Sequence, residues 1–555
     1  MKLNRRNFIK EIGVGTVAAS VATPLSLISC STPAGKVEQE EEGPVIRIGE
    51  DIAIADTAYG KVKGYIKQGI YTFLGIPYGA DTSGKNRFMP PQPPEPWQGV
   101  RPTVFYGPSA PQEIYSRAST SYGMFVDHWN YDELSEDCLC LNIWTPEAND
   151  ANKRPVIVWL HGGGYSRGNG IEQDSYHGEN IARYGNVVFC SVNHRLGAIG
   201  FTDLSAVGGE KYRDSGNAGL LDMVAALQWV HRNIAGFGGD PGNVTIMGQS
   251  GGGGKVCLLA TMPETKGLIH KGVALSGSAV SGNNKKYSEQ LGSYILKEAG
   301  LSPSQVDQLQ EIPWENYLQI AHRAAAQMER EVGDSGMRRG SFGPVADGIH
   351  LPQEPFFSDR TGRMPDIPML FCTTFHEQSP SRTNAALEEI TLQGVTEEIR
   401  KQYGDRAEMI VKAYTKAFPQ VKPIEILCLI QSNRLAVIET ATAKLQQTSP
   451  VYMAWFGWCP PLFDHRIRAF HCLDISFWFM NTDRMYTHTG GGARPRTLSQ
   501  KMADALLAFV RTGDPNCEAL PNWPVYTAAK GETMILNDPC EVQEDPDREA
   551  RQTLI

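Results

Sequence analysis

The run from Gly248 to Gly252 reads G-Q-S-G-G and fits the pattern G-x-S-x-G. An apolar run at 244–247 leads into it, so the serine stands on a turn between an expected strand and an expected helix. Such a nucleophile elbow lifts the serine hydroxyl above the sheet, and the first N–H groups of the helix face the point where negative charge develops during acyl transfer. We therefore predict that Ser250 is the nucleophile of an acyl-transfer reaction.

A second glycine-rich run, Gly162 to Gly164, follows His161 and an apolar run at 156–160. Without Cβ atoms, backbone amides there can approach and point at a ligand oxygen, which is what an oxyanion hole requires. We predict that the N–H groups of Gly162, Gly163 and Gly251 stabilise the oxyanion. Taken without the elbow, the same run would read as an ordinary turn after a strand.

Lys255 follows the elbow glycines and invites a comparison with phosphate-binding loops. Two positions disagree with that motif, because Gln249 stands where the first glycine belongs and Val256 replaces the Ser or Thr that holds magnesium. We reject a phosphate-binding loop for this reason.

Three apolar runs and one helix are expected to position these residues. The runs at 156–160, 187–192 and 244–247 lack polar alternation, which is typical of parallel strands buried on both faces. Residues 219–234 place apolar side chains on one helical face, and the segment 238–241 ends that helix. Strand and helix therefore alternate, as in an α/β fold.

These motifs and others along the chain resemble the type-B carboxylesterase family, which includes bacterial para-nitrobenzyl esterases and the cholinesterases. The resemblance covers roughly residues 55–540, and its further landmarks are Phe73 to Tyr78, Arg87, Phe88, Ser135 to Leu139, Phe237 to Pro241, Thr512 to Asn516, Trp523 and Pro524. It implies an α/β-hydrolase fold over residues 51–555, with a central, mostly parallel sheet flanked by helices. It further implies serine carboxylesterase activity on a small-molecule ester, without a metal or an organic cofactor.

The resemblance also implies an acid and a base for the serine. Glu377 occupies the place of the family's glutamate after a strand, with Asp347 and Glu354 as substitutes. His471 occupies the place of the family's histidine, with His465 as the second candidate. The resulting order of nucleophile, acid and histidine is the one expected of α/β-hydrolases.

Two departures from the family pattern stand out. The family's cysteine partner for Cys138 is Ala110 here, so that disulfide cannot form. At the elbow, the common Glu and Ala are Gln249 and Gly251. Because the oxyanion donor is a backbone N–H group, Gly251 is still expected to serve.

Helical patterns at 286–299, 314–331 and 385–447 are expected to insert around the mouth of the active site and to set substrate choice. Aromatic side chains that could line the site are Tyr165, Trp129, Trp455 and Trp458. The last two follow a strand-like pattern and are expected in the core instead, as are the thiols of Cys190 and Cys257.

The N-terminus reads as an export signal. Residues 1–29 carry the pair Arg5 and Arg6, typical of twin-arginine export, before a weakly apolar stretch that is too short and polar to span a bilayer stably. Leu27 to Cys30 resembles a lipobox, which predicts acylation of Cys30 and a lipid anchor in the bacterial cell envelope, either periplasmic or on the cell surface; cleavage after Ala22 is the alternative. Residues 30–50 are acidic and are expected to form a hydrated tether.

The net charge of −9 argues against a nucleic-acid partner, since such binding needs a basic surface. Cys138 and Cys140 have no second cysteine or histidine pair at the spacing of a zinc site. Two other functions stay open at this point: a non-catalytic adhesion or binding protein with the same fold, and hydrolysis of amides or lactones by the same residues. Oligomeric state is left open.

Overall fold

A computed structural model describes residues 44–114, 133–332, 342–353, 356–358 and 362–555. The predicted signal segment 1–29 and the predicted lipidation site Cys30 lie outside the described residues, as do Trp129 and Glu354. The residues Ile46–Ile555 form one compact unit, and the description below concerns that unit. Within its described part, no helix is long and apolar enough to cross a membrane.

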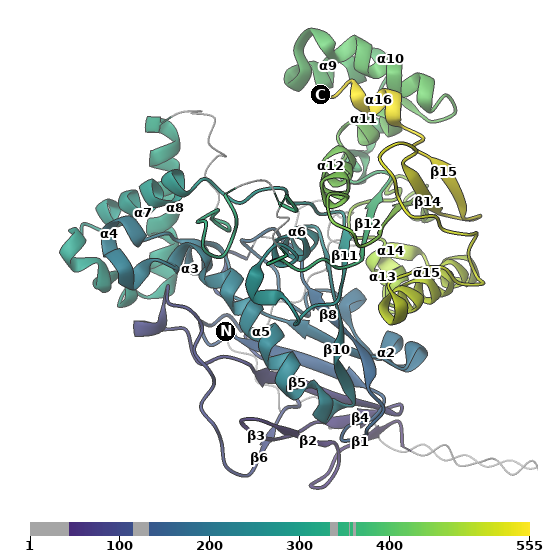
Figure 1. Cartoon of the computed structure of the whole chain (residues 1–555). Helices are drawn as coiled ribbons and strands as arrows, with labels where there is room; N and C mark the ends of the chain where they lie inside the picture. The colour runs from purple at the N-terminus through teal and green to yellow at the C-terminus, as the bar shows by residue number, and fades with distance from the viewer. Residues whose placement is uncertain (1–43, 115–132, 333–341, 354–355, 359–361) are drawn as a thin grey trace, which may run out of the picture. The chain divides into compact units, whose positions relative to one another are not determined.

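A 12-stranded sheet runs through this unit in the order β1-β4-β5-β7-β9-β8-β10-β11-β12-β13-β14-β15 (Figure 1). Neighbours from β9 to β14 in this order are parallel, and the remaining pairs are antiparallel. Its strands are β1 (Ile46–Arg47), β4 (Tyr65–Lys67), β5 (Ile70–Pro77), β7 (Cys140–Thr145), β8 (Arg154–Leu160), β9 (Val188–Val192), β10 (Gly239–Gln249), β11 (Lys271–Leu275), β12 (Met369–Thr374), β13 (Val451–Phe456), β14 (Glu532–Leu536) and β15 (Glu541–Glu544). The predicted fold, a mostly parallel sheet flanked by helices, is confirmed.

A second, three-stranded sheet is formed by β2 (Ile54–Thr57), β3 (Gly60–Lys63) and β6 (Val100–Pro102). β1 pairs with β4 and lies within the segment 30–50 that the sequence assigns to the tether, so regular structure begins before residue 51.

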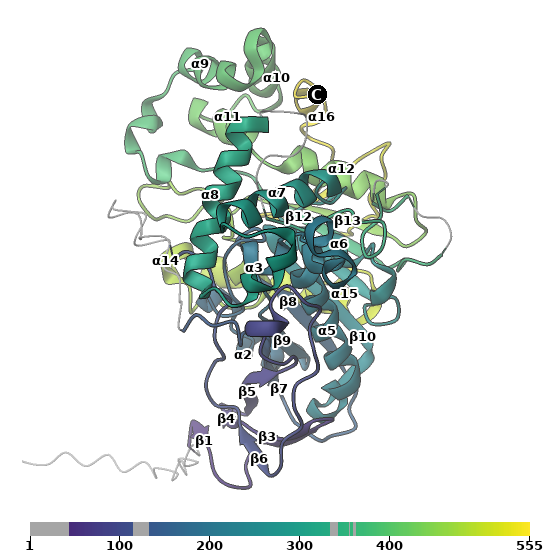
Figure 2. The same ribbon diagram turned by 90° about the vertical axis from the view of Figure 1, so that its left-hand side faces the viewer.

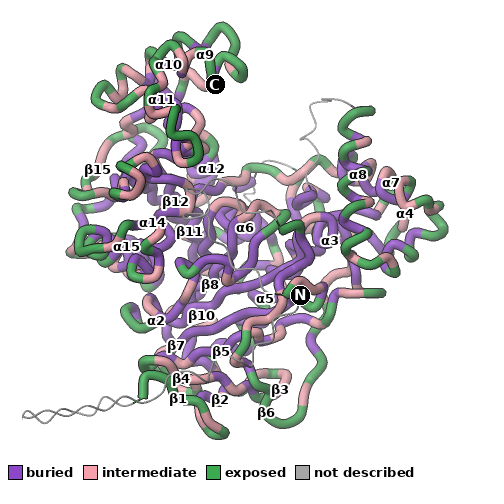
Figure 3. The backbone as a smooth tube through the Cα atoms, turned by 180° about the vertical axis from the view of Figure 1, so that it is seen from behind, coloured by how far each residue is buried: buried purple, intermediate pink, exposed green. Residues whose placement is uncertain are grey.

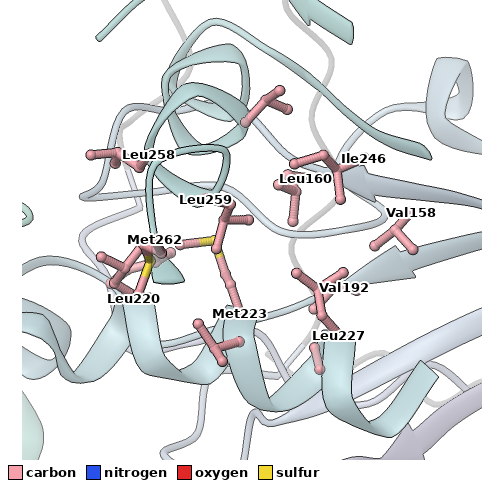
Figure 4. Close-up of a cluster of buried hydrophobic side chains, with 14 of the residues drawn as sticks. Val158, Leu160, Val192, Leu220, Met223, Leu227, Ile246, Leu258, Leu259 and Met262 are labelled. Carbon is pink, nitrogen blue, oxygen red and sulfur yellow. The ribbon is translucent and has the colours of Figure 1, made fainter. Parts of the chain in front are cut away.

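The apolar strands alternate between two cores, one on each face of the large sheet. In β8, Val156, Val158 and Leu160 belong to one core, whereas Ile157 and Trp159 belong to the other. Figure 4 shows part of the first core, where side chains of β8, β9 and β10 meet α5 (Ala218–Asn233) and α6 (Gly251–Leu259). The labelled residues are Val158, Leu160, Val192, Leu220, Met223, Leu227, Ile246, Leu258, Leu259 and Met262. Burial on both faces explains why these strands carry unbroken apolar runs.

Helices cover both faces. On the face of the first core lie α5 (Ala218–Asn233), α6 (Gly251–Leu259), α7 (Lys285–Glu298), α8 (Trp314–Val332) and α12 (Arg434–Lys444), and on the other face lie α2 (Glu179–Gly185), α13 (Ile475–Trp478) and α15 (Ala493–Thr512). Three further short helices are α3 (Gly197–Phe201), α4 (Ser205–Gly208) and α14 (Tyr486–Thr489). The helices predicted at 219–234, 286–299 and 314–331 are therefore confirmed to within a residue or two.

A third core lies at one end of the unit. It joins α9 (Leu392–Tyr403), α10 (Ala407–Ala417), α11 (Pro423–Ile430) and α16 (Arg548–Gln552). Figures 1 and 2 both show α9, α10 and α11 grouped at the end opposite the small sheet, and Figure 3 shows the exposed outer turns of α9 and α10. These helices form the insertion predicted at 385–447, and α9 and α11 contribute residues to the cavity described below.

Candidate active site

Ser250 stands between the last residue of β10 and the first residue of α6. Its backbone is left-handed, with φ of 58° and ψ of −122°, a conformation that costs a non-glycine residue about 1–3 kcal/mol. Two backbone hydrogen bonds hold it: its N–H donates to the carbonyl of Leu275 at 2.7 Å, and its own carbonyl accepts from the N–H of Gly254 at 3.1 Å. The structure therefore has the strand-turn-helix geometry that the G-x-S-x-G pattern predicts.

Close backbone approach explains the glycines around this turn. A Cβ atom on Gly252 would lie 2.1 Å from the carbonyl oxygen of Leu160, and one on Gly277 would lie 2.0 Å from the carbonyl oxygen of Ser250. A side chain at either position would push the elbow away from its neighbours.

The predicted oxyanion loop, which we define as residues 161–164, follows β8 and lies beside the elbow. A Cβ atom on Gly162 would lie 3.5 Å from the Cβ of Ser250, and one on Gly251 would lie 2.4 Å from the Cα of Gly164. The Gly162 N–H is within hydrogen-bonding reach of the Tyr176 hydroxyl, whereas within the described part of the chain no backbone carbonyl accepts a hydrogen bond from the N–H of Gly163. The N–H of Gly251 belongs to the first turn of α6, where helix N–H groups lack intrahelical partners.

Glu377 and His471 meet as the sequence predicts. Nδ1 of His471 is hydrogen-bonded to Oε2 of Glu377, and the His471 N–H donates to the Glu377 carbonyl at 3.2 Å. The other carboxylate oxygen accepts from the Ser276 hydroxyl at 2.7 Å and from the Thr374 N–H at 2.9 Å. The carboxylate is 1% exposed, so these bonds fix its orientation out of solvent.

Charge around His471 favours its protonated form. Burial acts against the imidazolium, but the Glu377 carboxylate and, secondarily, Asp474 outweigh burial and raise the pKa of His471 above its ordinary 6.5. Asp474 is fully buried and accepts from the Trp478 indole N–H at 3.2 Å. Burial and the nearby Glu377 charge raise the pKa of Asp474 to about 7.

Gln249 connects the predicted nucleophile to the predicted base. Its side-chain nitrogen lies 3.2 Å from Nε2 and 3.3 Å from Nδ1 of His471, and its side-chain oxygen accepts from the Cys472 thiol at 3.2 Å. The sequence marked Gln249 only as a departure from the family pattern. Its contact with His471 joins residues 222 positions apart, which no local motif reveals.

A cavity of about 1130 Å³ opens over these groups. Ser250, His471, Glu377, Gln249 and the glycines of the oxyanion loop line it, together with Ile114, Arg167, Glu172, Gln173, Tyr176, Gln378, Ser379, Pro380, Arg382, Thr383, Gln402, Tyr403, Ile430, Gln431, Ser432, Phe470 and Cys472. Gly251 is not among the lining residues. A second cavity of about 680 Å³ shares Gly164 and Arg167 with the first, and α8 contributes Leu318 and His322 to it.

The competing candidates lie elsewhere. His465 is exposed on a turn, and Asp347 accepts hydrogen bonds from the backbone of residues 349–351; neither lines the cavity. Tyr165 lines the second cavity rather than the first.

The residues expected in the core are found there. Trp455 is 1% exposed and Trp458 is 5% exposed. The thiols of Cys190 and Cys257 are fully buried, and Cys138 is a free thiol, as are all the cysteines that the structure describes.

Known proteins are similar to this chain in sequence and in fold. The model of the carboxylesterase family matches residues 51–553. A para-nitrobenzyl esterase of Bacillus subtilis (strain 168) is 33% identical over 515 residues, covering 90% of this chain and 98% of that protein. A phenmedipham hydrolase of Pseudarthrobacter oxydans is 31% identical over 520 residues, covering 90% and 99%.

Among solved structures, an esterase of Clostridium hathewayi that can hydrolyse aliphatic aromatic polyesters superposes with a TM-score of 0.78 at 34% identity, covering 91% of this chain and 98% of that one. The non-catalytic alternative is not favoured by these relatives, which are esterases and hydrolases. The chain therefore belongs to the carboxylesterase family and is a serine hydrolase that acts on carboxylic esters.

Proposed function

We propose that Ser250, His471 and Glu377 form the catalytic triad of this carboxylesterase. The observation that carries the proposal is the hydrogen bond between Nδ1 of His471 and Glu377, in a cavity that Ser250 also lines. A carboxylate on Nδ1 leaves Nε2 as the basic nitrogen, which is the tautomer that a serine hydrolase needs.

In the first half of the reaction, the Ser250 oxygen attacks the ester carbonyl carbon while His471 takes the hydroxyl proton. The tetrahedral intermediate collapses as His471 returns that proton to the leaving alkoxide, which departs as the alcohol. Water then attacks the acyl-enzyme with His471 again as the base, and the carboxylic acid is released. Glu377 stabilises the imidazolium in both halves.

The N–H groups of Gly162, Gly163 and Gly251 are proposed to donate to the oxyanion of both tetrahedral intermediates. Their position in the two turns that meet at Ser250 supports this role. Each such donor lowers the barrier by about 3 kcal/mol.

The test is hydrolysis of para-nitrophenyl acetate, butyrate and octanoate by the full chain and by Ser250→Ala. We expect turnover by the parent and none above background by the variant, with the preferred chain length reporting the acyl site. Serine-independent turnover would reject the assigned nucleophile. Amides and lactones assayed in parallel test the remaining alternative, which is hydrolysis of these compounds. Their hydrolysis would use the same catalytic residues and would differ only in the leaving group.

We further propose that the protein is exported by the twin-arginine route and held in the bacterial cell envelope through acylated Cys30. The lipobox-like Leu27 to Cys30 and the acidic segment that follows support this. Labelling of cells with a palmitate analogue should mark the parent but not Cys30→Ser. Equal labelling of both would reject the anchor.

A further inference from the structure

A second histidine stands beside the proposed acid of the triad. His376 directly precedes Glu377 in the turn that follows β12, and 5% of the residue is exposed. It does not line the cavity over Ser250, so any effect on the ester is indirect. A buried imidazole needs hydrogen-bond partners for its ring nitrogens, and those of His376 reach the base segment and the helical insertion.

Three hydrogen bonds join the acid segment to the base segment. The His376 N–H donates to the Ala469 carbonyl at 3.1 Å, and the His471 N–H donates to the Glu377 carbonyl at 3.2 Å. In addition, the Ala469 N–H donates to Nδ1 of His376 at 3.4 Å. The imidazole of His376 therefore supplies the side-chain contact among these three bonds, two residues before the base.

The bond to Ala469 fixes the tautomer of His376. Because Nδ1 accepts, the proton of the neutral ring is on Nε2, which lies 3.4 Å from Oε1 of Glu425 near the start of α11. Burial lowers the pKa of His376 below its ordinary 6.5, against the hydrogen bond and the charge of Glu425, so the ring is neutral near pH 7. One ring nitrogen thus has its partner in the base segment and the other has its partner in the insertion at 385–447.

The insertion holds the base segment through a further contact. Arg468, three residues before the base, binds both carboxylate oxygens of Glu388, at 2.6 and 2.9 Å. Its Nε lies 4.0 Å from Oε1 of Glu425, whose other carboxylate oxygen accepts from the Lys422 N–H at 2.9 Å. The insertion therefore contacts the acid segment through His376 and the base segment through Arg468.

We propose that His376 is a positioning residue for ester hydrolysis: its imidazole holds the base segment against the acid segment, and Glu425 holds the imidazole. The distance between Glu377 and His471 is thereby fixed from outside the cavity. A reacting group misplaced by about 1 Å can lower the rate about 100-fold, so such a contact matters for turnover. The inference rests on the proposed function, because it presupposes that Glu377 and His471 are the acid and the base.

Three substitutions of His376 separate its two contacts. The side-chain oxygen of Asn can take the place of Nδ1, so His376→Asn keeps an acceptor for the Ala469 N–H and loses the contact with Glu425. The side-chain nitrogen of Gln can take the place of Nε2, so His376→Gln keeps the donor to Glu425 and loses the acceptor. His376→Leu loses both.

His270 offers a matched control with the same arrangement. Its N–H donates to the Val244 carbonyl at 2.8 Å, and the Val244 N–H donates to its Nδ1 at 3.1 Å. It directly precedes β11, at the end of the sheet opposite the elbow, and lines neither cavity described above. His270→Leu therefore removes an equivalent imidazole contact without touching the acid or the base.

The experiment measures kcat and KM for para-nitrophenyl butyrate, the pH profile of kcat and the melting temperature of these variants in the full chain. His376→Leu should lower kcat about 100-fold with KM within about 3-fold, as expected when a catalytic group is misplaced but the substrate site is intact. His376→Gln should lose about 30-fold and His376→Asn only about 3-fold, because only the latter keeps the direct hold on the base segment.

The pH profile separates positioning from a loss of stability. Glu377 and Asp474 raise the pKa of His471, and Arg382 lowers it. A looser contact with Glu377 lowers the pKa of His471, so the acid limb of His376→Leu should move to lower pH, by up to about 1 unit. His270→Leu should lower the melting temperature and leave kcat, KM and the acid limb unchanged.

Folded His376→Leu with the kcat and the acid limb of the parent would overturn the proposal. Equal kinetic losses in His270→Leu would overturn it as well, and so would a kcat of His376→Gln at or above that of His376→Asn. Should His376→Leu not fold, the comparison of the Asn and Gln variants decides alone, since both keep a polar side chain at this position.

The proposed function fails separately. Activity surviving in Ser250→Ala would reject the nucleophile, whatever the His376 variants do. Activity lost in Ser250→Ala but retained in His376→Leu would leave the triad in place and reject only the role of His376.

Discussion

The two halves of the proposed active site are held in different ways. The nucleophile half, made of the oxyanion loop and the elbow, is positioned by backbone against backbone, with glycines at Gly252 and Gly277 that leave no space for a Cβ atom. The acid–base half, made of residues 374–377 and 463–474, is positioned by side-chain hydrogen bonds and charge. Several non-glycine residues of that second half have left-handed backbone, namely Phe463, Asp464, His465, Arg468 and Cys472.

This difference predicts which substitutions each half tolerates. The nucleophile half should be sensitive to added volume, because its backbone segments approach one another too closely to admit a Cβ atom. Its hydrogen-bond donors are backbone N–H groups, which no side chain can replace. The acid–base half should be sensitive to lost charge and lost hydrogen bonds, because its geometry depends on Glu377 and on the groups that orient it.

The largest effect should come from Glu377→Gln in the acid–base half. The amide keeps the shape but cannot stabilise the imidazolium and favours the wrong tautomer of His471, so we expect kcat to fall about 10,000-fold. The measurement is steady-state hydrolysis of para-nitrophenyl butyrate.

The pH profile of the same variant has a definite sign. Catalysis needs neutral His471, and Glu377 raises its pKa, so the parent loses activity as pH falls through a value above 6.5. Without the carboxylate charge, this acid limb should move to lower pH. A limb that stays in place or moves upward would contradict the assignment of Glu377 as the partner of His471.

The second largest effect should come from Gly252→Ala in the nucleophile half. The added Cβ would lie 2.1 Å from the Leu160 carbonyl and 2.9 Å from that of His161, so the oxyanion loop and α6 must separate. We expect a loss of about 1–3 kcal/mol of stability from overpacking and about 100-fold in kcat from misplaced donors.

Gly254→Ala is the matched control for this prediction. It lies in the same helix, but its added Cβ would approach within 3.0 Å only the hydroxyl of Tyr165, at 2.9 Å, which is the far end of a side chain, and would make an ordinary contact of 3.5 Å with the Ser278 carbonyl oxygen. Equal losses of kcat in the two variants would show that the helix tolerates no bulk anywhere, and the contrast between the halves would fail.

The same contrast explains what the sequence could predict. The nucleophile half consists of two short turns, each directly after an apolar strand, so Ser250 and the glycines follow from local pattern alone. β10 is longer than the predicted run at 244–247, since it begins at Gly239, which pairs with Arg154 across a register shift that apolar periodicity does not encode.

The acid–base half could be found only through the family resemblance. Glu377 comes shortly after β12, whereas His471 follows an irregular segment after β13, and their meeting depends on these two strands lying side by side. The Gln249 contact and the contact of His376 with Glu425 were not predicted, because each joins positions far apart in sequence through a fold that no local motif specifies.

A smaller effect is expected from Ser276→Ala. Its hydroxyl donates to Glu377 at 2.7 Å, while the Thr374 N–H continues to hold the same oxygen at 2.9 Å. Losing one of two donors should lower kcat about 10-fold, equivalent to about 1.4 kcal/mol. Ser499→Ala is the control, since that serine is equally buried and donates to the Phe477 carbonyl at 2.8 Å outside the cavity lining. A smaller loss in Ser276→Ala than in Ser499→Ala would argue that side-chain hydrogen bonds do not hold the acid.

The smallest effect on kcat is expected from Gln249→Glu, where the two halves touch. The side-chain nitrogen of Gln249 lies 3.2 Å from Nε2 of His471, so a carboxylate there would stabilise the imidazolium and raise the pKa of His471 further. The acid limb of the pH profile should then move to higher pH by about 1 unit, as expected for an opposite charge within about 4–6 Å, while kcat on the alkaline side stays within about 3-fold. Gln249→Met, which removes the amide without adding charge, should leave the limb in place. If Glu and Met at this position gave the same pH profile, the amide would not lie against the imidazole during turnover. The packing of the two hydrophobic cores against the sheet would then be enough to align Ser250 with His471.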